Sequence, residues 1–115
     1  MRVRDLVLAA MSGDDLAARQ WVKDAQRARV DLAALPPPTG LDRDGMAVAA
    51  GLAQLFAERC GRAAPDWTQA VGPASRPIYL CRESPTLRSV CLDRSPEVLR
   101  RRNVFAVNSD YLNVL

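Results

Sequence analysis

Hydrophobic residues recur at helical spacing in the first third of the chain. After a short apolar stretch over about residues 3–11, Ser12, Gly13 and Asp14 mark a turn and supply a helix N-cap. The apolar positions that follow keep the i, i+3, i+4, i+7 spacing of one helix face: Ala18, Trp21, Val22, Ala25, Ala28 and Leu32. Charged residues occupy the other side, so the pattern predicts an amphipathic helix over about residues 14–29.

A second long helix is predicted over about residues 42–60, after a proline-rich turn at residues 36–40. The three consecutive prolines of that turn lack amide donors and favour an extended backbone, so no helix continues through them. Gly61 follows as the residue that ends the helix. One stripe holds Met46, Ala49, Leu52, Ala53, Phe56 and Cys60, and Val48, Ala50, Leu55 and Ala57 widen it. We therefore expect this helix to be the central buried element.

The rest of the chain divides into short pieces. Residues 65–67 predict one helical turn, and a loop between two prolines follows. Ser-Pro pairs at 84–85 and 95–96 predict two further short helices, to about Leu92 and Arg102, each with serine as N-cap and proline as first residue. Residues 104–115 fit either a short strand and turn or a final helix. The predicted fold is mainly α: one small helical domain over residues 1–115.

Composition and charge agree with a small globular domain. The 115 residues suit one domain, and 49% hydrophobic with 25% charged residues lies near the average of folded proteins. The net charge of +3 comes from residues 61–115, with eight arginines and five acids, because residues 1–60 balance eight basic against eight acidic residues. With no signal segment and no apolar run of about 18 residues, we expect a cytoplasmic protein without a membrane span.

The residues that usually carry catalysis are scarce. The chain has no histidine, the commonest general base and metal ligand. Cys60, Cys81 and Cys91 lack C-x2-C spacing, so we interpret them as small buried apolar residues. Neither glycine-rich phosphate motif is present. We expect no enzyme activity, no metal and no cofactor, since a cysteine or aspartate nucleophile would lack an activating base.

Two acidic pairs, Asp14/Asp15 and Asp42/Asp44, stand where helices are predicted to begin. Negative charge at a helix N-terminus is favoured by the helix dipole, and aspartate is a preferred N-cap. We therefore interpret both pairs as helix caps rather than as acid-base groups.

The candidate partner-binding residues lie in two basic regions. In the first, Arg19, Lys23 and Arg27 form a row at i, i+4 spacing, with Gln20 and Trp21 beside it. Trp21 is expected to anchor the helix to the core. The alternative is that Trp21 sits at the rim of the row, where it and Arg19 would make a pair of residue types enriched at interface hot spots.

The second basic region is the run Arg100, Arg101, Arg102 and Asn103. Cations near a helix C-terminus are stabilised by the dipole, and asparagine can end the helix. Three consecutive helical residues point in directions about 100° apart, however, so they cannot all serve one helix end. We expect at least one arginine to be free to contact a phosphate backbone or an acidic protein surface.

Three strings together resemble a group of small proteins of GC-rich bacteria, and that group is similar to the antitoxin-side partners encoded beside nucleotidyltransferase-type toxins. The strings are Gly13-Asp14-Asp15-Leu16-Ala17-Ala18-Arg19-Gln20-Trp21-Val22-Lys23-Asp24-Ala25, Ala64-Pro65-Asp66-Trp67-Thr68 and Ser95-Pro96-Glu97-Val98-Leu99-Arg100-Arg101-Arg102-Asn103. The resemblance covers roughly residues 8–105. It implies an antitoxin that binds and neutralises the toxin. Some relatives of this kind carry a further helix-turn-helix domain, and no such domain is recognisable here.

The leading prediction is therefore a non-enzymatic protein-binding module, an antitoxin-like partner of a nucleotidyltransferase-type toxin. The alternative is a small regulatory protein that binds nucleic acid through its arginine-rich surfaces, with an affinity that falls steeply as salt rises. Homo-oligomers are compatible with either, because a chain of this size gains stability from any substantial interface.

Overall fold

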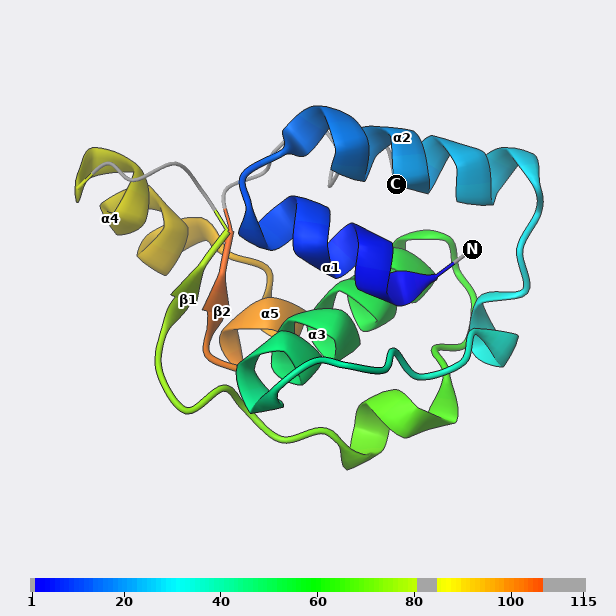
Figure 1. Ribbon diagram of the computed structural model, residues 1–115. Helices are drawn as coiled ribbons and strands as arrows, with labels where there is room; N and C mark the ends of the chain where they lie inside the picture. Colours follow the sequence, from blue (N-terminus) through cyan, green and yellow to red (C-terminus); the bar gives the residue numbers. More distant parts are fainter. Residues whose placement is uncertain (1, 81–84, 107–115) are drawn as a thin grey trace.

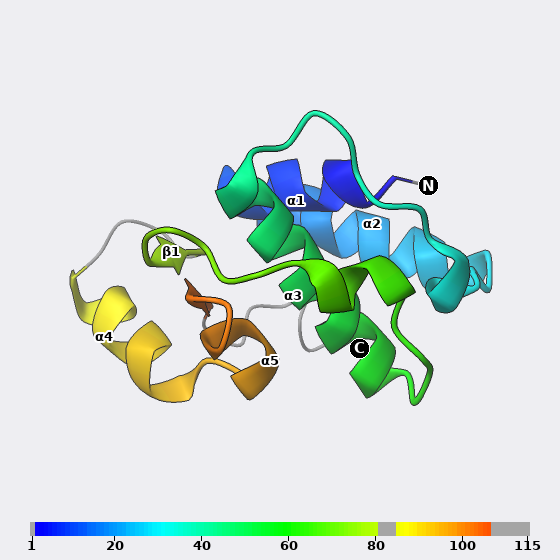
Figure 2. The same cartoon turned by 90° about the horizontal axis from the view of Figure 1, so that it is seen from below.

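The computed structural model describes residues 2–80 and 85–106, which form the mainly helical fold that the sequence predicts. Helices α1 (Val3–Met11) and α2 (Asp15–Arg27) lie side by side on one side of the long helix α3, and helix α5 and two short strands lie on the other side (Figures 1 and 2). Buried side chains from all of these elements join in one hydrophobic core. Among the described residues, no helix has the length and apolar character needed to cross a membrane.

Local signals explain where α1 ends and α2 begins. Gly13 takes a left-handed backbone with φ +75, which turns the chain sharply after α1. The Asp14 carboxylate then accepts a hydrogen bond from the Ala17 amide at 3.0 Å and caps α2. The buried face of α2 consists of Ala18, Val22 and Ala25, in agreement with the predicted stripe.

Helix α3 (Arg43–Arg59) is the buried centre that its apolar sequence predicts (Figure 2). Eleven of its seventeen residues are buried. Asp42 caps it by accepting a hydrogen bond from the Gly45 amide at 2.7 Å, and Gly61 follows its end with φ +65. The predicted beginning and end of this helix are therefore confirmed to within one residue.

Two single-turn helices and the proline-rich turn connect the longer elements. The 3-10 helix η1 (Leu32–Ala34) precedes residues 36–40, which adopt no helix, and the 3-10 helix η2 (Asp66–Ala70) is the helical turn predicted after Pro65. The indole of Trp67 donates a hydrogen bond to the carbonyl of Leu35 at 2.8 Å. This bond ties the two connections to each other across α3.

The C-terminal part contains a small parallel sheet that sequence periodicity does not reveal. Strand β1 (Ile78–Tyr79) pairs with β2 (Val104–Phe105), and helices α4 (Pro85–Arg94) and α5 (Glu97–Arg100) lie between them in sequence. The rings of Tyr79 and Phe105 stack with centroids 5.6 Å apart. The open choice for residues 104–115 is thus a strand at its start, and residues 107–115 lie outside the described part.

One predicted cap is wrong. Pro96, not Ser95, is the N-cap of α5, and no side chain caps that helix. The Ser95 hydroxyl instead donates to the carbonyl of Ala106 at 3.1 Å and accepts from its amide at 2.8 Å. The helix also ends earlier than predicted, at Arg100. The equivalent prediction for Ser84 falls outside the described residues.

Candidate partner-binding site

The outer surface of α2 brings together most of the first predicted basic region. Since successive helical residues are rotated by about 100°, four residues point away from the buried face: Leu16, Gln20, Lys23 and Arg27, with the half-buried Arg19 at the edge. We call these five residues the α2 face. Leu16 is 72% exposed, the most exposed large hydrophobic residue of the described chain.

Two charged residues of the α2 face, Lys23 and Arg27, are turned to solvent, whereas Arg19 is half-buried. The Gln20 amide donates to the Asp24 carboxylate at 2.8 Å. Lys23 and Arg27 are exposed, and their side chains make no hydrogen bond or ion pair with the part of the chain that the structure describes. Two cationic groups and one large apolar side chain are therefore presented together on a rigid helix.

Trp21 does not belong to this face. Its indole points to the inner side of α2, donates a hydrogen bond to the carbonyl of Arg2 at 2.9 Å and meets the Phe56 ring edge-to-face at a centroid distance of 6.2 Å. The residue is half-buried and packs against the core. Its placement agrees with the predicted core anchor and not with the alternative of an interface hot spot.

The second predicted region is divided between the surface, where Arg100 and Arg101 lie, and the interior, where Arg102 lies. Arg102 is only 6% exposed, which corrects its selection as a surface contact. Its guanidinium donates to the side-chain oxygen of Gln54 and, at 2.8 Å, to the carbonyl of Thr68. Arg101 donates to the same Gln54 oxygen at 2.7 Å, although it is itself exposed. These bonds hold the end of α5 on the middle of α3 and on η2.

Arg102 is buried without a carboxylate partner among the described residues. Burial lowers the pKa of its guanidinium, and the nearby charge of Arg101 lowers this pKa further. An arginine remains protonated in proteins, so the neutral oxygens of Gln54 and Thr68 must stabilise a full charge. We interpret this group as a structural one, because both of its hydrogen-bond partners belong to the core of the fold.

Asn103 and Arg100 complete the account of the run. Asn103 takes a left-handed backbone with φ +62 and ends the helix, as predicted, while its amide donates to the carbonyl of Ala74 at 3.5 Å. Arg100 is exposed, and its side chain makes no polar contact with the described part of the chain. Since α5 packs on α3 while α2 packs on α1, the two predicted regions lie on opposite sides of the molecule (Figures 1 and 2).

A pocket that the sequence did not reveal lies between the C-terminal ends of α2 and α3. It has a volume of about 240 Å³, its apolar lining includes Leu32, Phe56 and Cys60, and Arg29 and Arg62 line it as well. Arg62 is held by a hydrogen bond to the carbonyl of Val30 at 3.2 Å. The pocket combines residues more than thirty positions apart, which local patterns cannot bring together.

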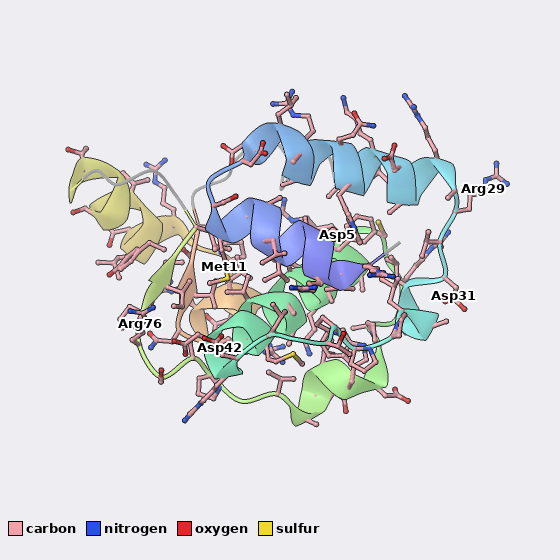
Figure 3. All side chains as sticks on the ribbon, in the orientation of Figure 1. Asp5, Met11, Arg29, Asp31, Asp42 and Arg76 are labelled. Atoms are coloured by element: carbon pink, nitrogen blue, oxygen red, sulfur yellow. The ribbon has the colours of Figure 1, made fainter. Side chains whose placement is uncertain are left out.

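Arg29 lies at the edge of the molecule just beyond α2 (Figure 3). It lines this pocket in an unusual backbone conformation. Its φ is +50, the left-handed region that normally favours glycine. The amides of Arg29 and Val30 donate to the carbonyls of Gln26 and Ala25, which is the bonding pattern of a helix end. Helices α1 and α3 are each followed by a glycine with positive φ, Gly13 and Gly61, whereas Arg29 has this conformation after α2. An arginine at a position that favours glycine is the sequence signal that could have drawn attention to this pocket.

Cys60 corrects a further prediction, because it is exposed rather than buried. It follows the last residue of α3 and faces the same pocket as Arg29. Cys81 and the side chain of Cys91 lie outside the described part of the molecule.

All four acidic residues stand at the helix N-termini where they were predicted, with Asp44 in the first turn of α3. Asp14 and Asp42 are N-caps and Asp15 stands in the first turn of α2. Asp44 does more: it accepts hydrogen bonds from the amide and hydroxyl of Ser75, and it faces Arg76 at 3.4 Å. The Ser75 hydrogen bonds lower the pKa of Asp44, and the charge of Arg76 adds to the effect. Within the described ranges no cluster of cysteine and acidic side chains is arranged to hold a metal ion.

Comparison with known proteins returns no match: no family model, no curated protein and no solved structure is similar to this chain.

Proposed function

We propose that the chain is a non-enzymatic protein-binding module whose binding surface is the α2 face. The observation that carries the proposal is the alignment of Leu16, 72% exposed, with the unpartnered cations of Lys23 and Arg27 along one helix. A large apolar side chain beside cations that make no internal bonds suits a partner with an apolar contact and an acidic rim.

The two parts of the α2 face have different roles in such an interface. Fully burying a leucine side chain contributes about 1.5–3 kcal/mol, so covering Leu16 would supply much of the affinity. Exposed charges at an interface rim mainly set the association rate and its dependence on salt. Lys23 and Arg27 would therefore select an acidic partner and speed its approach.

The resemblance to antitoxin-side proteins suggests a more specific proposal about the partner. One of the resembling strings, residues 13–25, contains most of the α2 face. In this proposal the chain is a cytoplasmic antitoxin-like partner that covers an acidic surface of a nucleotidyltransferase-type toxin and neutralises it. The arginine run of another string contributes to the fold through Arg101 and Arg102 rather than to the interface.

Co-expression of the tagged chain with the product of the adjacent gene tests this proposal. We expect the two proteins to copurify, and the double substitution K23E/R27E and the single substitution L16E each to weaken binding at least tenfold, as expected for charge reversal at the rim and loss of an apolar anchor. The substitution R94E, at an exposed arginine of α4, is the matched control and should leave binding unchanged.

Three outcomes would overturn the proposal. One is an absence of any copurifying protein. Another is copurification that neither K23E/R27E nor L16E weakens. The third is capture of nucleic acid instead of protein, with an affinity that falls steeply with salt concentration, which would favour the alternative of a nucleic-acid-binding protein.

A further inference from the structure

We propose that the pocket between the C-terminal ends of α2 and α3 binds a small carboxylic acid with an apolar body, of the size of an arylalkanoic acid. This site is separate from the α2 face and does not depend on the proposed protein partner. Its chemistry is set by an apolar lining and two arginines.

The lining and size of the pocket suit one aromatic ring with a short chain. Leu32, Phe56 and Cys60 give it apolar walls, and its volume is about 240 Å³. An apolar cavity of ~150 Å³ is large enough to hold benzene. The remaining volume accommodates two or three further heavy atoms, and the ring of Phe56 offers an aromatic contact.

The charge of the pocket selects an acid over a neutral ligand. Arg29 and Arg62 both line it, and no carboxylate does. The C-terminal ends of α2 and α3 each contribute a partial negative charge of about −0.5. The two full positive charges of Arg29 and Arg62 outweigh them. A carboxylate is the group that guanidinium binds best, with two parallel hydrogen bonds.

Both arginines are available for such a contact. One amino group of Arg62 donates to the Val30 carbonyl at 3.2 Å, which fixes the guanidinium beside the turn that contains Arg29. The side chain of Arg29 makes no hydrogen bond or ion pair with the described residues. Asp31, two residues after Arg29, accepts a hydrogen bond from the Ala33 amide and caps η1.

The backbone of Arg29 supports a functional role for its side chain. Glycine would serve this left-handed position without strain, as Gly61 does at the end of α3. Strained residues of this kind occur preferentially at ligand sites. An arginine is therefore kept here at a cost to the backbone, at a position that lines the pocket.

Calorimetric titration with 3-phenylpropionate tests the proposal, with 3-phenylpropionamide as the neutral matched ligand. We expect sub-millimolar binding of the acid and at least tenfold weaker binding of the amide. R29G and R62Q should each weaken binding of the acid about tenfold, the size expected for one charged hydrogen-bonded contact. R94Q should have no effect, because Arg94 lies outside the pocket.

Cys60 supplies a second readout at the site itself. Bound 3-phenylpropionate should slow alkylation of Cys60 by iodoacetamide at least fivefold, as measured by mass spectrometry of the chymotryptic peptide, and the R29G protein should lose this protection. The K23E/R27E protein should keep it, since those residues do not line the pocket. Absence of binding, equal binding of acid and amide, or binding that R29G and R62Q leave unchanged would each overturn the proposal.

Discussion

The left-handed backbone of Arg29 has a cost in folding free energy that a substitution can measure. A left-handed conformation costs a residue with a side chain about 1–2 kcal/mol, and glycine loses roughly 0.5–1 kcal/mol through its greater freedom in the unfolded chain. We expect R29G to raise the free energy of unfolding by up to about 1 kcal/mol in urea denaturation.

Gly61 provides the matched control for Arg29. It has φ +65, and a methyl group at its Cβ position would meet no atom within 4 Å. G61A should therefore lower the free energy of unfolding through backbone strain alone, by about 1 kcal/mol. If R29G instead destabilised the protein as much as G61A does, the strain assigned to Arg29 would be refuted.

Asp44 makes a pH-dependent contribution. The Ser75 hydrogen bonds lower the pKa of its carboxyl, so the folded state favours the ionised form. The stabilisation is present above the ordinary aspartate pKa of about 4 and is lost as pH falls through the lower pKa of the folded state.

We expect an NMR titration of the Ser75 amide to report a midpoint below pH 4, and D44N to abolish that transition. A midpoint at or above 4 would contradict the assigned hydrogen bonds. The Asn side chain still offers one acceptor to Ser75, so the loop should remain in place in D44N.

Sequence signals at single residues were reliable where a local rule decides the outcome. Asp14, Asp42, Gly61 and Asn103 all act as predicted, because capping and left-handed turns depend on residues at most four positions away. Arg102 could not be placed in this way. Its burial depends on Gln54, 48 positions earlier, which no local pattern connects to it.

Among the elements, the contact of α3 with α5 depends on a glycine. A Cβ at Gly51 would lie 2.8 Å from a methyl carbon of Leu99, which is fully buried and has no room to move. Overpacking costs about 1–3 kcal/mol, and the better helix propensity of alanine offsets up to about 1 kcal/mol.

We therefore expect G51A to lower the free energy of unfolding by roughly 1–2 kcal/mol, as measured in urea. G72A is the control, because a Cβ at Gly72 would meet no atom within 4 Å. An unchanged or increased stability of G51A would contradict the close approach of these helices.

The elements differ in how far the sequence reveals them. The long helices α2 and α3 were predicted because apolar periodicity over thirteen or more residues is a strong signal. Strands of two residues carry almost no periodicity, so β1 was not predicted and β2 was predicted only as one of two alternatives. At Ser95, the local capping preference lost to hydrogen bonds with Ala106, eleven residues away, which fasten β2 to the start of α5.

At the scale of the whole molecule, the structure assigns different roles to the two basic regions that the sequence predicted alike as partner-binding. The α2 face is exposed and carries an apolar residue among its charges, whereas the arginine run mainly fastens α5 to α3. Sequence reasoning identified the basic row of α2, but it missed Leu16 as part of the same surface and missed the pocket lined by Arg29 and Arg62. The exposure of Leu16 and the formation of the pocket both depend on which sides of the helices pack against the core.

Hydrogen–deuterium exchange of the chain, with and without the copurified partner, tests the protein-binding proposal most directly. The account predicts slower exchange in residues 15–27 on binding, with little change in residues 97–103. Protection confined to residues 97–103, or no protection of α2 in a complex that forms, would contradict it.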